Sequence, residues 1–248
     1  MPSENCKYRR ILLKLSGEAL MGSQSFGIDP DVIGGIADEI RQAYSLGVQI
    51  AVVVGGGNIF RGVQGSKWGM DKAAADYVGM LATIMNALIL QEVLNHKGIE
   101  TRVQTAIAMP EIAEPFIRLR AIRHLQKGRV VIFGGGTGNP HVTTDTAAAL
   151  RAAEMKADVL LMAKNKVDGI YSDDPRTNKA AKKLDYLSFN ELIKLDLNVM
   201  DTAGVSLCEN NNIPIVVFDF AQSGSIERII KGDKVGSIVG QTPSVVGG

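Results

Sequence analysis

The sequence predicts an α/β protein, a three-layer sandwich in which helices cover both faces of a mostly parallel sheet. Apolar runs typical of strands alternate with longer stretches of helical periodicity along the chain. The strand candidates are continuously apolar, as in residues 48–54 and 130–133, and this is typical of parallel strands buried on both faces. Glycine clusters follow directly after these two strands, at the sheet edge where ligands bind in such folds.

The expected elements follow one another in a regular order. The first strand, residues 10–17, places Lys14 and Ser16 on the face opposite to Ile11, Leu13 and Leu15, because a strand has a period of two. The first helix is expected to start at Asp29-Pro30, since proline is favoured in the first turn, and to end before Gly47. Further strands are expected at residues 48–54, 101–106, 130–133, 158–163, 213–218 and 236–239, and further helices at residues 73–95, 111–127, 144–156, 190–194, 200–210 and 225–231.

Composition indicates a globular protein with a large core, since 46% of the residues are hydrophobic and 21% are charged. The net charge of +1, without a basic stripe, argues against nucleic acid or membrane partners. We expect no apolar run close to the roughly 20 residues that cross a bilayer and no signal segment. Cys6 and Cys208 form neither a metal-type cluster nor a disulfide framework. We therefore expect a cytoplasmic protein, folded as one domain over residues 1–248.

Two glycine loops carry the main functional signal. Gly134-Gly-Gly-Thr-Gly-Asn-Pro links a buried strand to a helix that opens with Thr143, Thr144 and Asp145. Glycines allow the backbone to come close to a ligand, and a helix start offers free N–H groups. A glycine loop followed by a helix start therefore forms an anion-binding site. The alternative is an ordinary turn capped by Thr144. The second loop, residues 55–62, ends in Arg61; neither loop matches the dinucleotide pattern G-x-G-x-x-G.

Charged residues are expected at the same sheet edge. Lys14 ends a buried strand, which suggests an anionic partner, although a lysine there can also extend to solvent. Asp76 lies near a helix start, where the alternative is a charge that only complements the helix dipole. A lysine, an arginine and helix-start aspartates around glycine loops suit phosphoryl transfer, which depends on positioning and charge neutralisation. Neither a P-loop motif nor the protein-kinase motifs occur, and the histidines are scattered. Residues 164–175 are expected by default to form a surface hairpin.

Four motifs resemble the bacterial uridylate kinases, a group within the amino acid kinase family. The motifs are Lys-Leu-Ser-Gly-Glu-Ala-Leu at residues 14–20, Gly-Gly-Gly-Asn-Ile-Phe-Arg-Gly at residues 55–62, Gly-Thr-Gly-Asn-Pro with Thr-Thr-Asp at residues 136–145, and Lys-Val-Asp-Gly-Ile-Tyr at residues 166–171. The resemblance covers about residues 8–240, with the motifs in the same order. It implies the amino acid kinase fold, and transfer of the γ-phosphoryl group of ATP to UMP in pyrimidine nucleotide biosynthesis.

The resemblance also implies a role for individual residues. Asp145 would orient the catalytic Lys14, Arg61 would reach toward the phosphates, and Asp201 would lie near the catalytic centre. The implied ATP-binding residues are Lys14, Leu15, Ser16, Gly17, Gly57, Arg61, Asn165, Tyr171 and Asp174, of which the last three would form the adenosine side in place of a surface hairpin. The implied UMP-binding residues are Gly56, Asp76, which would accept from the ribose, Thr137, Gly138, Asn139, Pro140, His141, Val142, Thr143 and Thr144. Mg²⁺ would be bound through the nucleotide phosphates rather than directly by the protein.

The chain departs from the family at His141-Val142, where relatives often carry an aromatic pair, so the shape of the UMP pocket is open. The resemblance further implies a homohexamer built through the long helix at residues 73–95, with GTP as a possible activator and UTP as a possible inhibitor. The effector segment would be Gly22, Ser23, Gln24, Ser25, Phe26 and Gly27.

Alternatives remain at this point. Another kinase of the family would act on a carbamate, acylglutamate or isopentenyl phosphate acceptor, and a storage or regulatory module of the same fold would bind nucleotide without turning over UMP. A redox dinucleotide enzyme fits least, because both loops lack the dinucleotide pattern.

Overall fold

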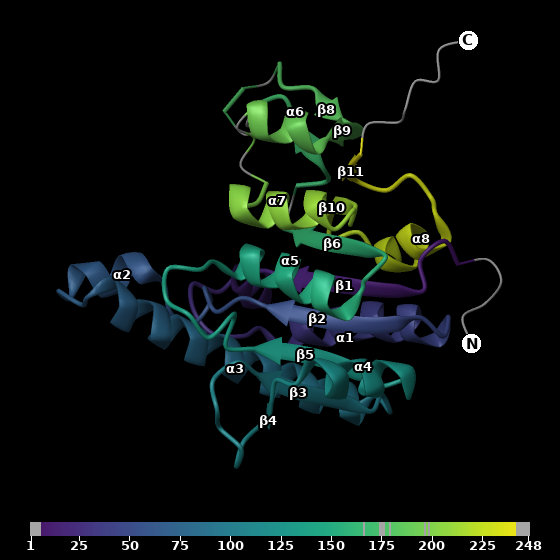
Figure 1. Ribbon diagram of the computed structural model, residues 1–248. Helices are drawn as coiled ribbons and strands as arrows, with labels where there is room; N and C mark the ends of the chain where they lie inside the picture. Colours follow the sequence, from purple (N-terminus) through teal and green to yellow (C-terminus); the bar gives the residue numbers. More distant parts are fainter. Residues whose placement is uncertain are drawn as a thin grey trace, which may run out of the picture.

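The computed structural model describes residues 6–165, 167–173, 177–178, 180–195, 197 and 199–241, with the backbone alone at 63, 64 and 66. A nine-stranded sheet runs through it (Figure 1). Its strands in chain order are β1 (Arg10–Leu15), β2 (Gln49–Val54), β3 (Thr101–Thr105), β4 (Glu114–Pro115), β5 (Val130–Gly134), β6 (Val159–Lys164), β9 (Tyr186–Ser188), β10 (Ile215–Asp219) and β11 (Ser237–Gly240).

The strand order is β4-β3-β5-β2-β1-β6-β10-β11-β9. The strands from β4 to β10 run parallel, while β11 pairs antiparallel with β10 and parallel with β9. β1 is therefore central, and the carboxyl ends of β1, β2, β5 and β6 meet at one edge. The mostly parallel α/β architecture predicted from the sequence is confirmed. A separate antiparallel pair joins β7 (Ile170–Tyr171) to β8 (Lys183–Leu184).

Helices cover both faces of the sheet (Figure 1). One core packs α1 (Pro30–Ser45), α3 (Lys72–His96) and α8 (Ser225–Lys231) against the sheet. The other core packs α4 (Arg118–Gln126), α5 (Thr144–Met155), α6 (Phe189–Lys194) and α7 (Thr202–Asn210) against the opposite face. The short η1 (Gly17–Met21) and α2 (Gly62–Lys67) follow the strand ends of β1 and β2.

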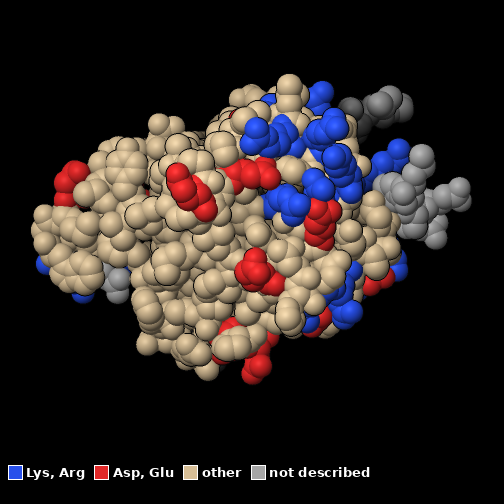
Figure 2. Space-filling view, turned by 90° about the horizontal axis from the view of Figure 1, so that it is seen from below, with Lys and Arg blue, Asp and Glu red and all other residues tan. Residues whose placement is uncertain are grey.

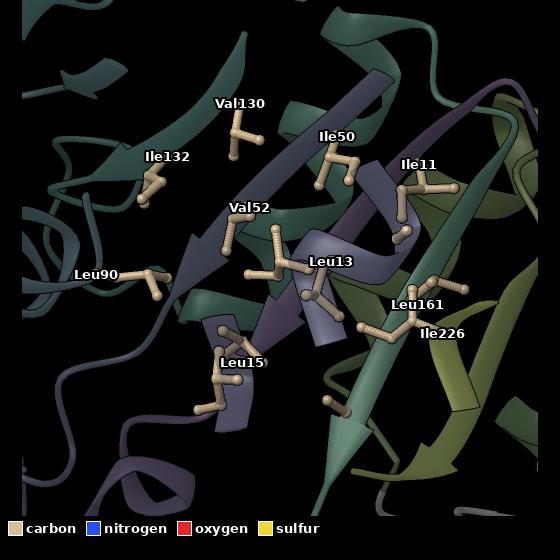
Figure 3. Packing of buried hydrophobic residues seen from close by; sticks show 14 of the residues in the cluster. Ile11, Leu13, Leu15, Ile50, Val52, Leu90, Val130, Ile132, Leu161 and Ile226 are labelled. Atoms are coloured by element: carbon tan, nitrogen blue, oxygen red, sulfur yellow. The ribbon is translucent and has the colours of Figure 1, made fainter. Parts of the chain in front are cut away.

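The alternation of β1 decides which of its side chains face the site. Ile11, Leu13 and Leu15 are fully buried in the core beneath α1, and Figure 3 shows them beside the β2 residues Ile50 and Val52. Leu12 lies in the opposite core with α5. Lys14 has the same orientation as Leu12, because residues two apart in a strand share a face. The predicted placement of Lys14 on the face opposite to Ile11, Leu13 and Leu15 is therefore confirmed.

Local capping explains where the helices begin. Asp29 caps α1 by accepting from the N–H of Asp31 and of Val32 (2.9 and 3.3 Å), and Pro30 is the first helical residue as predicted. Asp71 caps α3 in the same way, through the N–H of Ala74 (3.2 Å). These caps satisfy donors that the first helical turn leaves without intrahelical partners.

The predicted helix at residues 111–127 is wrong in its first half. Residues 114–115 form the short edge strand β4, and the helix begins only at Arg118. Pro115 explains the difference, because proline disrupts a helix interior by removing a hydrogen-bond donor and by a steric clash. η1, α2, β8 and β9 were not expected from the sequence either. The hairpin expected at residues 164–175 is wider, since β7 pairs with β8 rather than closing within that segment.

α3 also corrects the expectation that no segment approaches membrane-spanning length. Its 25 residues contain an 18-residue window with a mean hydropathy of 1.6, so it is long and apolar enough to cross a bilayer by length and composition alone. In the structure one side of α3 packs on the sheet through Leu90 and Leu94, which are fully buried. Such a helix is equally typical of a core helix in a globular fold.

Charge is unevenly distributed over the surface beside α4. α4 lies toward the bottom of Figure 1, and Figure 2, which views the molecule from below, shows Lys and Arg gathered at one end and a broad expanse with few charges elsewhere. α4 contributes the exposed Arg120 and Arg123, and Lys127 follows it. The chain therefore has a local basic surface despite its net charge of +1.

Candidate active site

An ion pair between β1 and α5 lies at the centre of the site. Lys14 Nζ is 2.7 Å from Asp145 Oδ1, and the side chains are 9% and 21% exposed. β1 supplies the lysine at its carboxyl end, while α5, capped by Thr143, supplies the aspartate in its first turn. A partly buried ammonium is costly to desolvate unless a counter-charge meets it. Asp145 supplies this charge and fixes the direction of Lys14.

Glycines allow two loops to meet beside this pair. A Cβ on Gly17 would lie 2.4 Å from the backbone nitrogen of Gly57, and one on Gly56 would lie 2.7 Å from the carbonyl oxygen of Gly79. Both distances are shorter than any real carbon contact, so these positions require glycine. Gly55 N–H donates to the carbonyl of Leu15 (2.9 Å) and ties the second loop to the end of β1.

Two cavities meet at the ends of the strands. The first, of about 270 Å³, is the Lys14 cavity; its lining is Lys14, Ser16, Gly17, Glu18, Gly55, Gly56, Gly57, Thr143, Thr144 and Asp145. The second, of about 260 Å³, is the Asp76 cavity; its lining is Gly56, Gly57, Phe60, Gly62, Ala75, Asp76, Gly79, Met80, Thr83, Gly136, Val142, Thr143 and Thr144. They share Gly56, Gly57, Thr143 and Thr144. Ligands in the two cavities would therefore meet across these four residues, next to the Lys14–Asp145 pair.

Asp76 connects α3 to the loop after β5. Its Oδ2 accepts from the N–H of His141 (2.7 Å) and from Lys72 Nζ (3.1 Å). Burial opposes the charged form, but these two donors lower the pKa of the Asp76 carboxyl. Asp71, not Asp76, caps α3, so Asp76 lies beyond the first turn of the helix. The alternative that Asp76 only complements the helix dipole from the first turn is therefore wrong.

Asp201 holds the start of α5 in place. It caps α7 through the N–H of Gly204 (2.7 Å), and its carboxylate accepts from Thr146 Oγ1 (2.6 Å) and from Thr143 Oγ1. Although burial opposes the charge, these hydroxyl and N–H donors lower the pKa of Asp201. Asp201 does not line the Lys14 or the Asp76 cavity, and its contacts are those of a residue that positions Thr143.

Arg61 lies at the exposed rim. Its guanidinium is 2.9 Å from Glu18 Oε1, and its Nε donates to the carbonyl of Gly57 (3.3 Å). The Arg61 and Glu18 side chains are 50% and 60% exposed, so the pair is weakly held in place. Arg61 is thus close to the glycine loop. Its partner Glu18 lines the Lys14 cavity, but Arg61 itself does not.

The structure describes two of the three expected adenosine residues, Asn165 and Tyr171, and their surroundings differ. Asn165 is exposed and lines a third cavity of about 650 Å³ beside α1, which also includes Gly22 and Ser23. The Tyr171 hydroxyl donates to Asp168 (2.7 Å), and this acceptor raises the pKa of Tyr171. Asp174 lies outside the described residues. Leu15 is fully buried in the core, so only its backbone is available to a ligand.

The loop from Thr137 to Val142 lies near the Asp76 cavity but supplies few of its walls. Val142 lines the cavity and is 39% exposed, whereas Thr137, Gly138, Asn139, Pro140 and His141 are not among its lining residues. His141 has φ 67°, in the left-handed region, and this conformation directs its N–H to Asp76. His141 thus meets Asp76 through its backbone, while its side chain is exposed.

The segment from Gly22 to Gly27, predicted to hold an effector, contacts the second glycine loop. Gly27 N–H donates to the carbonyl of Asn58 (2.9 Å), and Asn58 Nδ2 donates to the carbonyl of Gly27 (3.0 Å). Gly22 lies against Asp29, and the N–H of Gln24 donates to the carbonyl of Met21 in a turn. Ser25 is exposed, and Phe26 is 63% exposed. The segment is therefore linked to the site through Asn58.

Several polar residues of the site were missed from the sequence. Asn86 on α3 donates to the carbonyl of Gly55 (2.7 Å) and exchanges hydrogen bonds with Asn58, and both amides are buried. Thr83 Oγ1 accepts from the N–H of Gly135 (2.8 Å). The signal for Asn86 was a polar residue within an apolar helix. Lys164 was also missed, although it ends a buried strand as Lys14 does.

Comparisons with known proteins agree with this geometry. The family model described as "Amino acid kinase family" matches residues 9–219. A solved UMP kinase from Bacillus anthracis is 43% identical and superimposes with a TM-score of 0.93, covering 95% of this chain and 97% of that one. A UMP kinase from Ureaplasma parvum is 36% identical with a TM-score of 0.89, covering 95% and 100%. A uridylate kinase from Archaeoglobus fulgidus is 30% identical with a TM-score of 0.73, covering 92% and 99%. The chain therefore belongs to the amino acid kinase family.

Proposed function

We propose that this protein is a uridylate kinase that transfers the γ-phosphoryl group of ATP to UMP and releases ADP and UDP. The observation that carries the proposal is the junction of the Lys14 and Asp76 cavities across Gly56, Gly57, Thr143 and Thr144. Phosphoryl transfer needs two ligands held end to end, with cations and N–H donors at the junction. The likeness to UMP kinases with up to 43% identity supports UMP as the acceptor.

In this reaction an oxygen of the UMP phosphate attacks the γ-phosphorus of ATP. The bond between that phosphorus and the β,γ-bridging oxygen breaks, and the bridging oxygen leaves with the electron pair as part of ADP. Negative charge spreads over the transferred group, so fixed positive charges lower the barrier. Lys14, aimed by Asp145 at 2.7 Å, supplies such a charge at the junction. Ser16, Gly17 and Gly57 line the donor side, and Arg61 reaches the phosphates from the rim.

The acceptor side is proposed to bind UMP through Asp76 and the start of α5. Among the described residues, both partners of the Asp76 carboxylate bind Oδ2. Oδ1 is then the oxygen that accepts from a ribose hydroxyl. Thr143 and Thr144 offer the helix start to the UMP phosphate, and Asp201 keeps Thr143 in place. We keep the remaining loop residues, 137–142, and the adenosine residues Asn165, Tyr171 and Asp174 as proposed contacts.

Mg²⁺ is proposed to enter with ATP, where it neutralises phosphate charge. The described residues contain no group of three or more His, Cys, Asp or Glu arranged to hold a metal ion. Near the Lys14 cavity, Asp145 faces Lys14 and Asp201 faces two threonines. We propose that the nucleotide phosphates supply the ligands of the ion, as is common for Mg²⁺.

Steady-state assays that couple ADP release to a spectroscopic signal test the function. We expect Mg·ATP to turn over with UMP, and not with carbamate or N-acetylglutamate, because Asp76 and the helix start of α5 suit a ribose phosphate. Turnover with CMP measures the selectivity for the base, and turnover with dUMP measures the selectivity for the 2′-hydroxyl. Nucleotide binding without turnover of UMP would contradict the proposal and favour the storage or regulatory module of this fold.

Replacement of Asp145 tests the ion pair. Asp145→Asn is nearly isosteric, but it removes the counter-charge that directs Lys14. We expect kcat to fall by about 100-fold or more, the scale seen when one charge-stabilising group is lost from a preorganised site. Glu227→Gln is the matched control. It removes the surface ion pair between Glu227 and Lys231, whose charged atoms are 2.6 Å apart, and it should leave kcat unchanged. Equal activity of Asp145→Asn and the control would exclude Asp145 from the mechanism.

Replacement of Asp76 tests the acceptor side. We expect Asp76→Ala to raise KM for UMP by about tenfold or more, because a partly buried, charged acceptor of a hydrogen bond is lost, while KM for ATP changes little. Asp76→Asn is the companion variant, since it retains an acceptor for the His141 N–H. A comparable rise in both KM values would mean that Asp76 supports the whole site instead of binding the ribose.

The proposed oligomer rests on the outer face of α3. Tyr77, Leu81, Met85 and Ile89 recur at every fourth position and are 40–51% exposed. Contiguous exposed apolar surface of this kind marks an interaction site in soluble proteins. The same helix that buries one side on the sheet thus offers a second apolar face to another copy of the chain. We propose assembly through this face, with the homohexamer as the complete particle.

Light scattering after size-exclusion chromatography tests the assembly. Met85→Glu places a charge in the centre of the exposed apolar face of α3, and we expect the mass to fall toward the 26.5 kDa of one chain. Leu195→Glu, at another exposed apolar residue (56%), is the control and should not change the mass. A Met85→Glu protein with an unchanged mass would show that the subunits associate elsewhere.

We also propose nucleotide regulation, a cellular role and a one-domain organisation for this protein. Activation by GTP and inhibition by UTP are proposed to act through the segment from Gly22 to Gly27, whose contacts with Asn58 reach the glycine loop. A role in pyrimidine nucleotide biosynthesis in the cytoplasm agrees with Cys6 and Cys208, which are not joined in a disulfide. The one-domain organisation is supported by the nine-stranded sheet, whose strands extend from Arg10 to Gly240.

A further inference from the structure

A second lysine ends the strand next to β1, on the same face of the sheet as Lys14. Lys14 pairs in register with Met162 of β6, and Lys164 is two residues further along β6. Residues two apart in a strand share a face, so Lys164 faces the α5 side as Lys14 does. From the strand spacing and the rise per residue, the two Cα atoms are roughly 8 Å apart. Two long side chains at this spacing can reach one triphosphate.

The Lys164 ammonium has an incomplete set of partners. It donates to the carbonyl oxygen of Val199 (2.7 Å), and we find no carboxylate paired with it among the described residues. Asp219, its register neighbour on β10, accepts from the N–H of Ala221 (3.0 Å). An ammonium has three donor hydrogens, and a neutral carbonyl satisfies only one and supplies no counter-charge.

The charges that act on Lys164 are those of Lys14 and Asp145. Burial and the charge of Lys14 lower the pKa of Lys164, and the charge of Asp145 opposes them. Lys14 is already balanced by Asp145 at 2.7 Å. The three groups together carry a net charge of +1, and Lys164 is the member without an anion. A partly buried, unbalanced cation is unfavourable unless a ligand brings negative charge.

We propose that Lys164 is a second catalytic cation, which binds a phosphate oxygen of ATP on the side of the leaving ADP. This inference rests on the proposed phosphoryl transfer. Lys14 neutralises charge on the transferred group at the junction of the cavities. Lys164 lies on the strand next to β1 and neutralises the charge that grows on the β-phosphate as the bridging bond breaks. ADP binding is therefore also expected to depend on Lys164.

The competing role for Lys164 is that of an anchor. Through Val199 it holds the segment that leads to Asp201, and Asp201 holds Thr143 at the Asp76 cavity. Loss of an anchor would therefore weaken the UMP side first, whereas loss of a phosphate-binding cation would weaken ATP and ADP and leave UMP unaffected. The two roles thus predict opposite changes in the KM values.

The test uses Lys164→Met, which keeps the length of the stem and removes the charge, and Lys164→Gln, which keeps a donor toward Val199 without the charge. We expect both to lower kcat/KM for Mg·ATP by about 100-fold. Calorimetry should show affinity for ADP about tenfold weaker and affinity for AMP unchanged, since Lys164 binds beyond the α-phosphate. KM for UMP should stay within about threefold of the original protein.

Two controls make the result decisive. Lys231→Met removes a surface ammonium of α8 and should change none of these values, and Lys164→Arg should recover most of the ADP affinity by restoring the charge. If Lys164→Met does not fold, as judged by circular dichroism, the glutamine and arginine variants decide the question. Unchanged ADP affinity in Lys164→Gln, or a selective loss for UMP, would overturn the proposal. Because ADP binding needs no acceptor, it tests Lys164 even if UMP is not the acceptor.

Discussion

The ion pair between Lys14 and Asp145 is the interaction on which the arrangement of the site depends. It joins the central strand to the helix that follows the glycine loop, and it does so where the side chains are mostly withdrawn from water. Lys14 can occupy this position because the alternation of β1 sends its neighbours Leu13 and Leu15 into the opposite core. Asp145 can meet it because Thr143 starts α5 directly above the strand end. The pair thus fixes the distance between sheet and helix at the point where the ligands meet.

Backbone contacts extend this arrangement to the rest of the site. Gly17, Gly55 and Gly56 pack so closely against neighbouring backbone that any side chain there would clash. Buried amides then hold the loops: Asn86 on α3 binds the Gly55 carbonyl and Asn58. Buried polar groups that are fully hydrogen-bonded make such an arrangement specific. α3 therefore supports the glycine loop with one side, and its opposite side carries the apolar face proposed for assembly, so both are built on one rigid element.

Much of the fold was predictable because it follows from local rules. The apolar runs of β1, β2, β5 and β6 specified a parallel sheet, and Pro30 specified the start of α1. The errors came where short elements and proline interrupt a helical pattern, as at Pro115. The apolar character of α3 was underestimated, because isolated polar residues such as Asn86 interrupt its hydrophobic run. Lys164 was overlooked for a different reason, since its proximity to Lys14 depends on which strands are neighbours.

By itself, the sequence determined the α/β class, the two glycine loops and the charged residues at the strand ends, because periodicity and motifs are properties of consecutive residues. Only the tertiary structure decided how they combine. The strand order places β6 beside β1, and therefore Lys164 beside Lys14. The turn of the loop at His141 directs its N–H to Asp76, across 65 residues of sequence. These contacts join segments distant in the chain, and their geometry follows from the packing of the whole sheet with its helices rather than from any local pattern.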